Sequence, residues 1–205
     1  MGLNSQTIGL VSGGLVLLSV IPYAIRTYEG KIRPVPTSWS LWSLIGLAIL
    51  LTYRSSGAGA NIWPAVFGFS NPTLITILSV WRGEKWKSPN LAEKLCLLFG
   101  VLSLGLWLVL RQKQELAQYA LYVAIVADLC AAIPTIRFVW TEPDHDRPLS
   151  WLLYGTGYFL AIFAAPENTL ANWGLPLYMT AISFNVALPL VLYRFRQSVP
   201  LKEWA

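Results

Sequence analysis

The sequence predicts an all-α membrane protein in which seven transmembrane helices form two parallel three-helix repeats, joined by an inversion linker helix. The composition, the apolar stretches and an internal repeat predict this class. Hydrophobic residues make up 55% of the 205 residues and charged residues only 12%. A soluble domain of this size is expected to carry about twice that charged fraction. The composition therefore indicates an integral membrane protein.

Most of the apolar stretches approach the length of a membrane span, which is about 20 residues for a helix. They lack the alternation over about 10 residues that is typical of an outer-membrane barrel strand. Because backbone polar groups in hydrocarbon need partners within the segment, we expect α-helices. The stretches lie at 7–27, 36–53, 60–81, 92–110, 116–139, 149–165 and 172–193.

The basic residues lie mostly on one side of these predicted helices. If the N-terminus is outside, only Arg54, Arg111 and Lys113 of the 15 Lys and Arg residues lie on the outer side. Lys and Arg are retained on the cytoplasmic side, so we expect the C-terminus in the cytoplasm and the protein in the cell (inner) membrane. The net charge of +5 then reflects topology and contact with membrane lipid, and indicates no nucleic-acid partner.

One sequence frame occurs twice. Residues 21–39 read IPYAIRTYEGKIRPVPTSW and residues 133–151 read IPTIRFVWTEPDHDRPLSW, which places the two copies 112 residues apart. An unpaired fourth helix between two three-helix units lets both units cross the membrane in the same direction. We therefore expect a first repeat at 1–82, a linker and fourth helix at 83–113, a second repeat at 114–196 and a cytoplasmic tail at 197–205.

Each repeat has a proline inside its first helix, Pro22 and Pro134. Proline removes a helical hydrogen bond and clashes with the preceding turn, which kinks the helix. Such prolines are common in membrane helices, but two at the same repeat position favour a pair of hinges.

The repeated frame resembles the PQ-loop and SWEET (MtN3-saliva) transporter superfamily in its seven-helix, three-one-three form. Tyr23 and Thr135 replace the glutamine that follows the proline in many members. The resemblance implies alternating-access transport of a small polar solute, with sugar as the first expectation, through a site between the repeats. It also implies an asparagine from the third helix of each repeat, for which Asn71 and Asn185 are the candidates.

Two features depart from that family pattern. The spacing of 112 carries Asn71 to Ser183, two residues before Asn185. The second-helix positions where the family has tryptophans hold Leu50 and Ile162. We therefore expect stacking from other aromatic residues, namely Tyr53, Tyr158, Trp63 and Trp173.

Asp128 is the one acidic residue in the middle of a predicted span. A carboxylate there is costly unless it is protonated, paired or exposed to a watery cavity, so it indicates function. We expect Asp128 to contact the substrate or to exchange a proton during transport. The alternative is a structural hydrogen bond with Ser, Thr or Tyr.

Other functions remain as alternatives. The chain has neither an H-E-x-x-H nor a G-x-S-x-G motif, and its two cysteines have no metal-ligand spacing, so we expect no enzyme, no metal and no cofactor. A vitamin or nucleoside transporter of the nicotinamide-riboside type, or a non-transporting receptor with the SWEET fold, stays open. The sequence does not indicate an oligomeric state.

Overall fold

The structure, a computed structural model, describes residues 4–205 and is helical, with no strand in that range. The helices coincide with the predicted apolar stretches, which confirms the all-α class. Residues 1–3 of the expected first repeat lie outside the described range. The elements are α1 (Ser5–Ser19), α2 (Ile21–Tyr28), α3 (Pro36–Ser55), η1 (Ala60–Ile62), α4 (Trp63–Trp81), α5 (Leu91–Leu110), α6 (Gln114–Thr141), α7 (Pro148–Ile162), α8 (Leu170–Arg196) and η2 (Leu201–Glu203).

The helices have the surface of a membrane protein. Five stretches in the described range are long and apolar enough to span a bilayer: Ser5–Tyr28, Ala60–Trp81, Leu91–Leu110, Gln114–Thr141 and Leu170–Arg196. Their outer faces carry exposed large apolar side chains, among them Leu98, Val101, Leu108 and Val109 on α5. A soluble protein rarely exposes such contiguous apolar faces. The chain is therefore a helical integral membrane protein.

The helices α3 and α7 are not among these five spans. The helix α7 has only 15 residues, which gives a length of about 22 Å at 1.5 Å per residue, less than the about 30 Å of the hydrocarbon core. Both helices begin with a proline, Pro36 and Pro148, in the first helical turn. Proline suits that position because the first amide groups of a helix have no partner within it.

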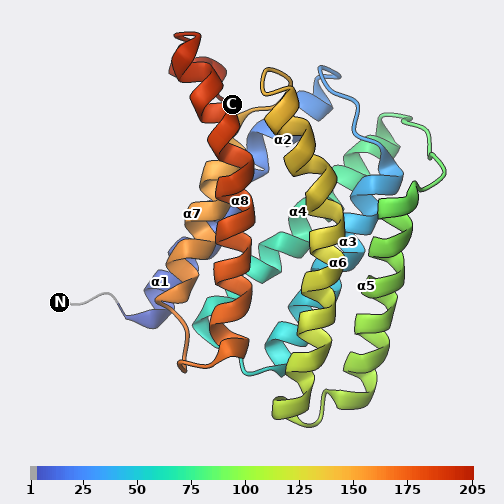
Figure 1. Ribbon diagram of the computed structural model, residues 1–205, viewed down its shortest axis with the longest axis vertical. Helices are drawn as coiled ribbons and strands as arrows, with labels where there is room; N and C mark the ends of the chain where they lie inside the picture. The colour runs from blue at the N-terminus through green and yellow to red at the C-terminus, as the bar shows by residue number, and fades with distance from the viewer. Residues whose placement is uncertain (1–3) are drawn as a thin grey trace.

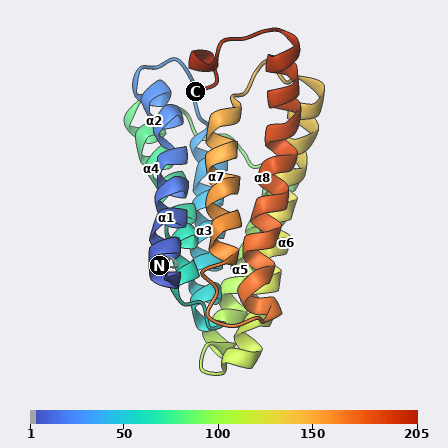
Figure 2. The same ribbon diagram turned by 90° about the vertical axis from the view of Figure 1, so that its left-hand side faces the viewer.

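The structure has two three-helix units, the first formed by α1 (with its continuation α2), α3 and α4, and the second by α6, α7 and α8. The two units pack in the same internal order. In the first unit α4 lies against both α1 and α3, and in the second α8 lies against both α6 and α7. Between the units, α1 packs on α7 and α3 packs on α6, while α5 packs on α3 and α6. Figures 1 and 2 show successive long helices running in opposite directions, so that α1, α4, α6 and α8 point the same way.

Small side chains allow close contact between the helices. A Cβ atom on Gly157 of α7 would lie 2.7 Å from the carbonyl oxygen of Ser12 in α1. On the buried face of α6, Ala120 and Ala124 are fully buried, and Ser103 Oγ of α5 donates to the Ala120 carbonyl over 2.8 Å. Close packing of small residues and polar contacts drives helix association in lipid, where hydrophobic burial gives no net drive.

The two repeat prolines have different effects on their helices. The first span breaks at Val20, between α1 and α2, two residues before Pro22. There the Val20 N–H bonds to the Leu17 carbonyl over 3.4 Å, a tighter turn than that of an α-helix. The helix α6 continues unbroken through Pro134. A break therefore accompanies Pro22 and not Pro134.

A buried arginine fixes the loop between α6 and α7. Arg194 is only 1% exposed. Its Nη1 donates to the Pro143 carbonyl over 3.2 Å, and its Nη2 donates to the Asp146 carbonyl over 2.5 Å. A charged group is costly to bury unless hydrogen bonds compensate it, and here those bonds tie the loop to the end of α8.

We expect Arg194→Met to release this loop, because two carbonyl contacts are lost while most of the side-chain volume is kept. Amide hydrogen exchange of residues 142–147, followed by mass spectrometry, should become about tenfold faster, the equivalent of about 1.4 kcal/mol in local opening. The matched control is Arg196→Met, because Arg196 is exposed. Equal exchange in the two variants would contradict the role of Arg194.

Candidate solute-binding cavity

A cavity of about 450 Å³ lies between the two three-helix units. Small-molecule sites commonly have volumes of about 300–1,000 Å³. The wall includes residues of both units as well as His145, Asp146 and Arg147 from the α6–α7 loop. That loop lies at the same end of the bundle as the α2–α3 connection and the C-terminal segment (Figure 1). The cavity therefore reaches this end, which we call the mouth.

The cavity wall repeats with the spacing of the sequence. A smaller pocket of about 20 Å³ adjoins the cavity and shares part of its wall; we call it the narrow part of the cavity. Six residues from the first unit line the cavity and a seventh lines the narrow part, and each has its counterpart 112 positions later on the opposite wall. The pairs are Tyr23 and Thr135, Arg26 and Phe138, Ser38 and Ser150, Trp39 and Trp151, Trp42 and Tyr154, Gly46 and Tyr158, and Asn71 and Ser183. Equivalent positions of the two units thus face a common space.

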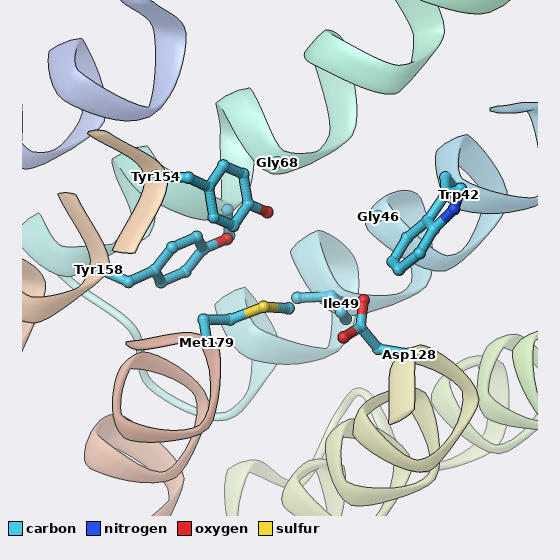
Figure 3. A pocket seen from close by; sticks show the side chains of 9 residues that line it. Trp42, Gly46, Ile49, Gly68, Asp128, Tyr154, Tyr158 and Met179 are labelled. Atoms are coloured by element: carbon cyan, nitrogen blue, oxygen red, sulfur yellow. The ribbon is translucent and has the colours of Figure 1, made fainter. Parts of the chain in front are cut away.

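The narrow part of the cavity is lined by aromatic and apolar side chains, together with Asp128. The rings of Tyr154 and Tyr158 lie 5.1 Å apart between centroids. Opposite them, α4 has Gly68, where a Cβ atom would lie 2.8 Å from Tyr158 Oη and 3.2 Å from Tyr154 Oη. Figure 3 shows the tyrosines on one side and Trp42 with Asp128 on the other, with Met179 between them. The glycine therefore leaves room for both hydroxyl groups.

Asp128 makes a structural hydrogen bond with a tyrosine and also lines the cavity. It is 5% exposed and lines both parts of the cavity. Tyr178 Oη of α8 donates to Asp128 Oδ2 over 2.8 Å. Within residues 4–205 this is the one hydrogen bond to the Asp128 side chain, and none is made to Oδ1. One carboxylate oxygen thus makes a structural hydrogen bond, and the other is left for a ligand or water.

Asn71 lines the cavity and also stabilises the break in the first helix. Its Nδ2 donates to the Val16 carbonyl over 2.7 Å, and Ser19 Oγ donates to the same carbonyl. In an unbroken helix that carbonyl accepts from the amide of Val20, which here bonds to Leu17 instead. Asn71 therefore replaces a backbone donor that the break removes.

Asn185 does not join Asn71 at the cavity. It is exposed, and its Oδ1 accepts a hydrogen bond from Trp140 Nε1 over 3.1 Å. Ser183 lines the cavity in its place. Successive helix residues are about 100° apart, so a shift of two residues turns a side chain by about 200° and away from the cavity. The paired-asparagine site expected from the sequence is therefore not assembled.

The end of the bundle opposite the mouth is closed by buried polar contacts. Tyr53, Asn61 and Asn172 are each 1% exposed. Tyr53 Oη donates to the Asn172 carbonyl over 2.8 Å, and Asn61 Nδ2 donates to both Tyr53 Oη and that carbonyl. This three-residue network joins the end of α3 and η1 to the first turn of α8.

The other expected aromatic residues lie away from the cavity wall. Trp63 packs on Phe67, with ring centroids 6.4 Å apart, and sits close to Gly13 of α1. Trp173 is 38% exposed. Of the four aromatic candidates only Tyr158 lines the cavity, in its narrow part. Of the two prolines, only Pro22 lines it.

Charged groups surround the mouth. Arg26, Asp146 and Arg147 line it, and Asp146 Oδ2 accepts from Trp151 Nε1 over 3.0 Å. The segment after α8 folds back here, because the Leu149 N–H donates to the Trp204 carbonyl over 3.1 Å. The mouth is therefore built from loops and tail as well as from helices.

Trp42, Tyr154 and Met179 were not among the residues expected at the site from the sequence. The 112-residue spacing contained a signal for two of them, because it pairs Trp42 with Tyr154. The family pattern directed attention further along these helices, to Leu50 and Ile162. No group of three or more His, Cys, Asp or Glu side chains in residues 4–205 is arranged to hold a metal ion.

We expect Asn71→Ala and Asn185→Ala to differ in stability. Loss of the Asn71 bond should lower the free energy of unfolding by about 1 kcal/mol, whereas the exposed Asn185 should contribute less than about 0.5 kcal/mol. Denaturant unfolding in detergent micelles measures both values. Equal losses would contradict the role of Asn71 at the helix break.

Comparison of the chain with models of protein families, with curated proteins and with solved structures finds no match.

Proposed function

We propose that this protein is a membrane transporter that moves a small polar solute by alternating access through the cavity between its two three-helix units. One observation carries the proposal: six pairs of residues 112 positions apart line the two walls of one cavity, and a seventh pair lines the small pocket that adjoins it. In parallel-repeat transporters, substrate sites lie at the interface between repeats, and the repeats move against each other around the site.

The closed and open ends of the cavity support the same proposal. One end reaches the loops around Asp146, while the other is closed by the network of Tyr53, Asn61 and Asn172. A transporter of this type alternates between access from one side and access from the other. With the basic residues on the cytoplasmic side, this structure corresponds to the state open to the cytoplasm.

The proposal extends to the fold family expected from the sequence. The order in which α4 lies against both α1 and α3, and α8 against both α6 and α7, is that of two equivalent units. It supports the seven-helix, three-one-three arrangement of the PQ-loop and SWEET resemblance. The sugar expectation has less support, because Asn185 lies outside the cavity.

A vitamin or nucleoside transporter is the second candidate. Flat rings stack well on aromatic side chains, and Trp42, Trp151 and Tyr154 line the cavity. A non-transporting receptor on the same fold would retain solute binding without uptake. A panel of solutes therefore has to include sugars, nucleosides, vitamins and amino acids.

Uptake of this labelled panel into proteoliposomes, with and without an inward proton gradient, tests transport and proton coupling. Ser183→Trp would fill the cavity, because Ser183 is 2% exposed and lines it. The matched control is Ala181→Trp, which adds the same ring at an exposed position of α8. We expect uptake to be lost in Ser183→Trp alone. No uptake by the folded wild-type protein, or equal uptake in both variants, would contradict the proposal.

A further inference from the structure

The carboxylate of Asp128 has no cationic partner in the described chain. It is 5% exposed, and its one hydrogen bond comes from the neutral Tyr178 hydroxyl. The ion pairs found in residues 4–205 involve Glu29, Glu84, Glu142 and Asp144, all outside the cavity's narrow part. A charged group inside a membrane protein normally pairs with another group or marks a ligand pathway.

The surroundings of Asp128 suit a cation with an apolar body. Beside Asp128 the cavity is lined by Trp42, Tyr154 and Met179, while its other charged side chains belong to the mouth, namely Arg26, His145, Asp146 and Arg147. Aromatic faces attract organic cations through the negative charge of their π-systems, and quaternary ammonium groups are bound in aromatic cages. Inorganic cations such as Ca²⁺ or Mg²⁺ need several oxygen ligands, and this part of the wall offers one carboxylate and one tyrosine hydroxyl group.

We infer that the solute is a monovalent organic cation, a protonated amine or quaternary ammonium whose charged head lies against Asp128 and whose body lies among the aromatic rings. That the bound cation is a transported solute rests on the proposed function, whereas its binding to the site does not. The narrow part, with about 20 Å³, is too small for such a molecule, so the ligand lies in the wider cavity of about 450 Å³, which also reaches Asp128 and accommodates a small molecule of this kind. The unbonded Oδ1 provides the counter-charge, while the bond from Tyr178 holds the carboxylate in place.

A neutral solute would interact differently with this site. With a neutral molecule bound in place of water, the Asp128 carboxylate would have to stay unpaired or take up a proton, whereas a bound cation pairs with it directly. The site therefore discriminates by charge, and pairs of molecules with the same shape and different charge test this directly. Choline and 3,3-dimethylbutan-1-ol form one such pair, and benzylamine and benzyl alcohol form another.

Binding of these four probes to the purified protein in detergent is measured by isothermal titration calorimetry. We expect each cation to bind at least about tenfold more tightly than its neutral counterpart, a difference of about 1.4 kcal/mol. Asp128→Asn should remove this preference, since the amide still accepts from Tyr178 but has no charge. The matched control is Asp144→Asn, an exposed loop acid, and it should keep the preference.

The outcomes separate the inference from the proposed function. Equal binding of cation and neutral probe by the wild-type protein, or binding of neither cation, overturns the inference without need of any variant. A preference that persists in Asp128→Asn overturns the role of this carboxylate. Cation binding without uptake in proteoliposomes leaves the inference intact and contradicts transport. Uptake of a neutral solute, together with no preference for cations in binding, supports transport and contradicts the inference.

Discussion

Gly9→Ala should strongly destabilise the protein. An added Cβ atom would lie 2.1 Å from the carbonyl oxygen of Ala60 in η1, a distance that only a backbone shift relieves. The helix α1 would have to move away from η1 at the closed end of the bundle. Overpacking of a tight contact costs about 3 kcal/mol, and we expect a loss of that order in the free energy of unfolding, measured by denaturant unfolding in detergent micelles.

The same helix offers a matched control in Gly14. A Cβ atom there would meet nothing within 4 Å, and alanine is favoured over glycine in a helix interior by about 1 kcal/mol. Gly14→Ala should therefore leave stability unchanged or raise it. A similar loss in both variants would show that alanine disturbs α1 generally and that the contact with Ala60 is not the cause.

Tyr53→Phe should open the closed end of the cavity. The substitution removes the donor to the Asn172 carbonyl and the acceptor for Asn61 Nδ2, and leaves buried polar groups with fewer partners. Such a loss costs about 1–3 kcal/mol. If this end must open during transport, the population open on that side should rise about tenfold for each 1.4 kcal/mol.

Cysteine labelling measures this shift. Ser183→Cys, in a chain whose Cys96 and Cys130 are replaced by alanine, places one thiol in the cavity. A membrane-impermeant thiol reagent should label it from the mouth side, and Tyr53→Phe should add labelling from the opposite side of oriented vesicles. The control is Tyr119→Phe, since Tyr119 is 56% exposed. Labelling from the mouth side alone in Tyr53→Phe would contradict a closing role.

The helices were predictable because long apolar runs fix where a membrane chain crosses. The expected stretch 60–81 coincides with η1 and α4, and 92–110 with α5 to within one residue. The break at Val20 was predictable in kind, because Pro22 lacks an amide hydrogen. The continuity of α6 was not, since the sequence around Pro134 contains the same helix-breaking element.

Part of the site was predictable from two signals, the acidic residue Asp128 inside a span and the repeat spacing where it was followed strictly. That spacing pairs Asn71 with Ser183, and both line the cavity. Asn185 was predicted by its residue type, but it lies on the face of α8 that points away from the cavity. The face on which a helix residue lies is set by its position in the sequence and not by its residue type. Tyr53 shows a second limit: the sequence indicates an aromatic ring near a helix end, but one of its two partners, Asn172, lies 119 residues away in sequence.

The unequal effect of the two repeat prolines makes the halves non-interchangeable. The first half has a jointed helix held by Asn71, while the second has a continuous one that carries Asp128. A chimera with two copies of the first half would have two joints, and Val16 would stand in the position of Asp128. A chimera with two copies of the second would have two carboxylates and no joint. Only the natural combination places a single negative charge opposite a helix that is already bent.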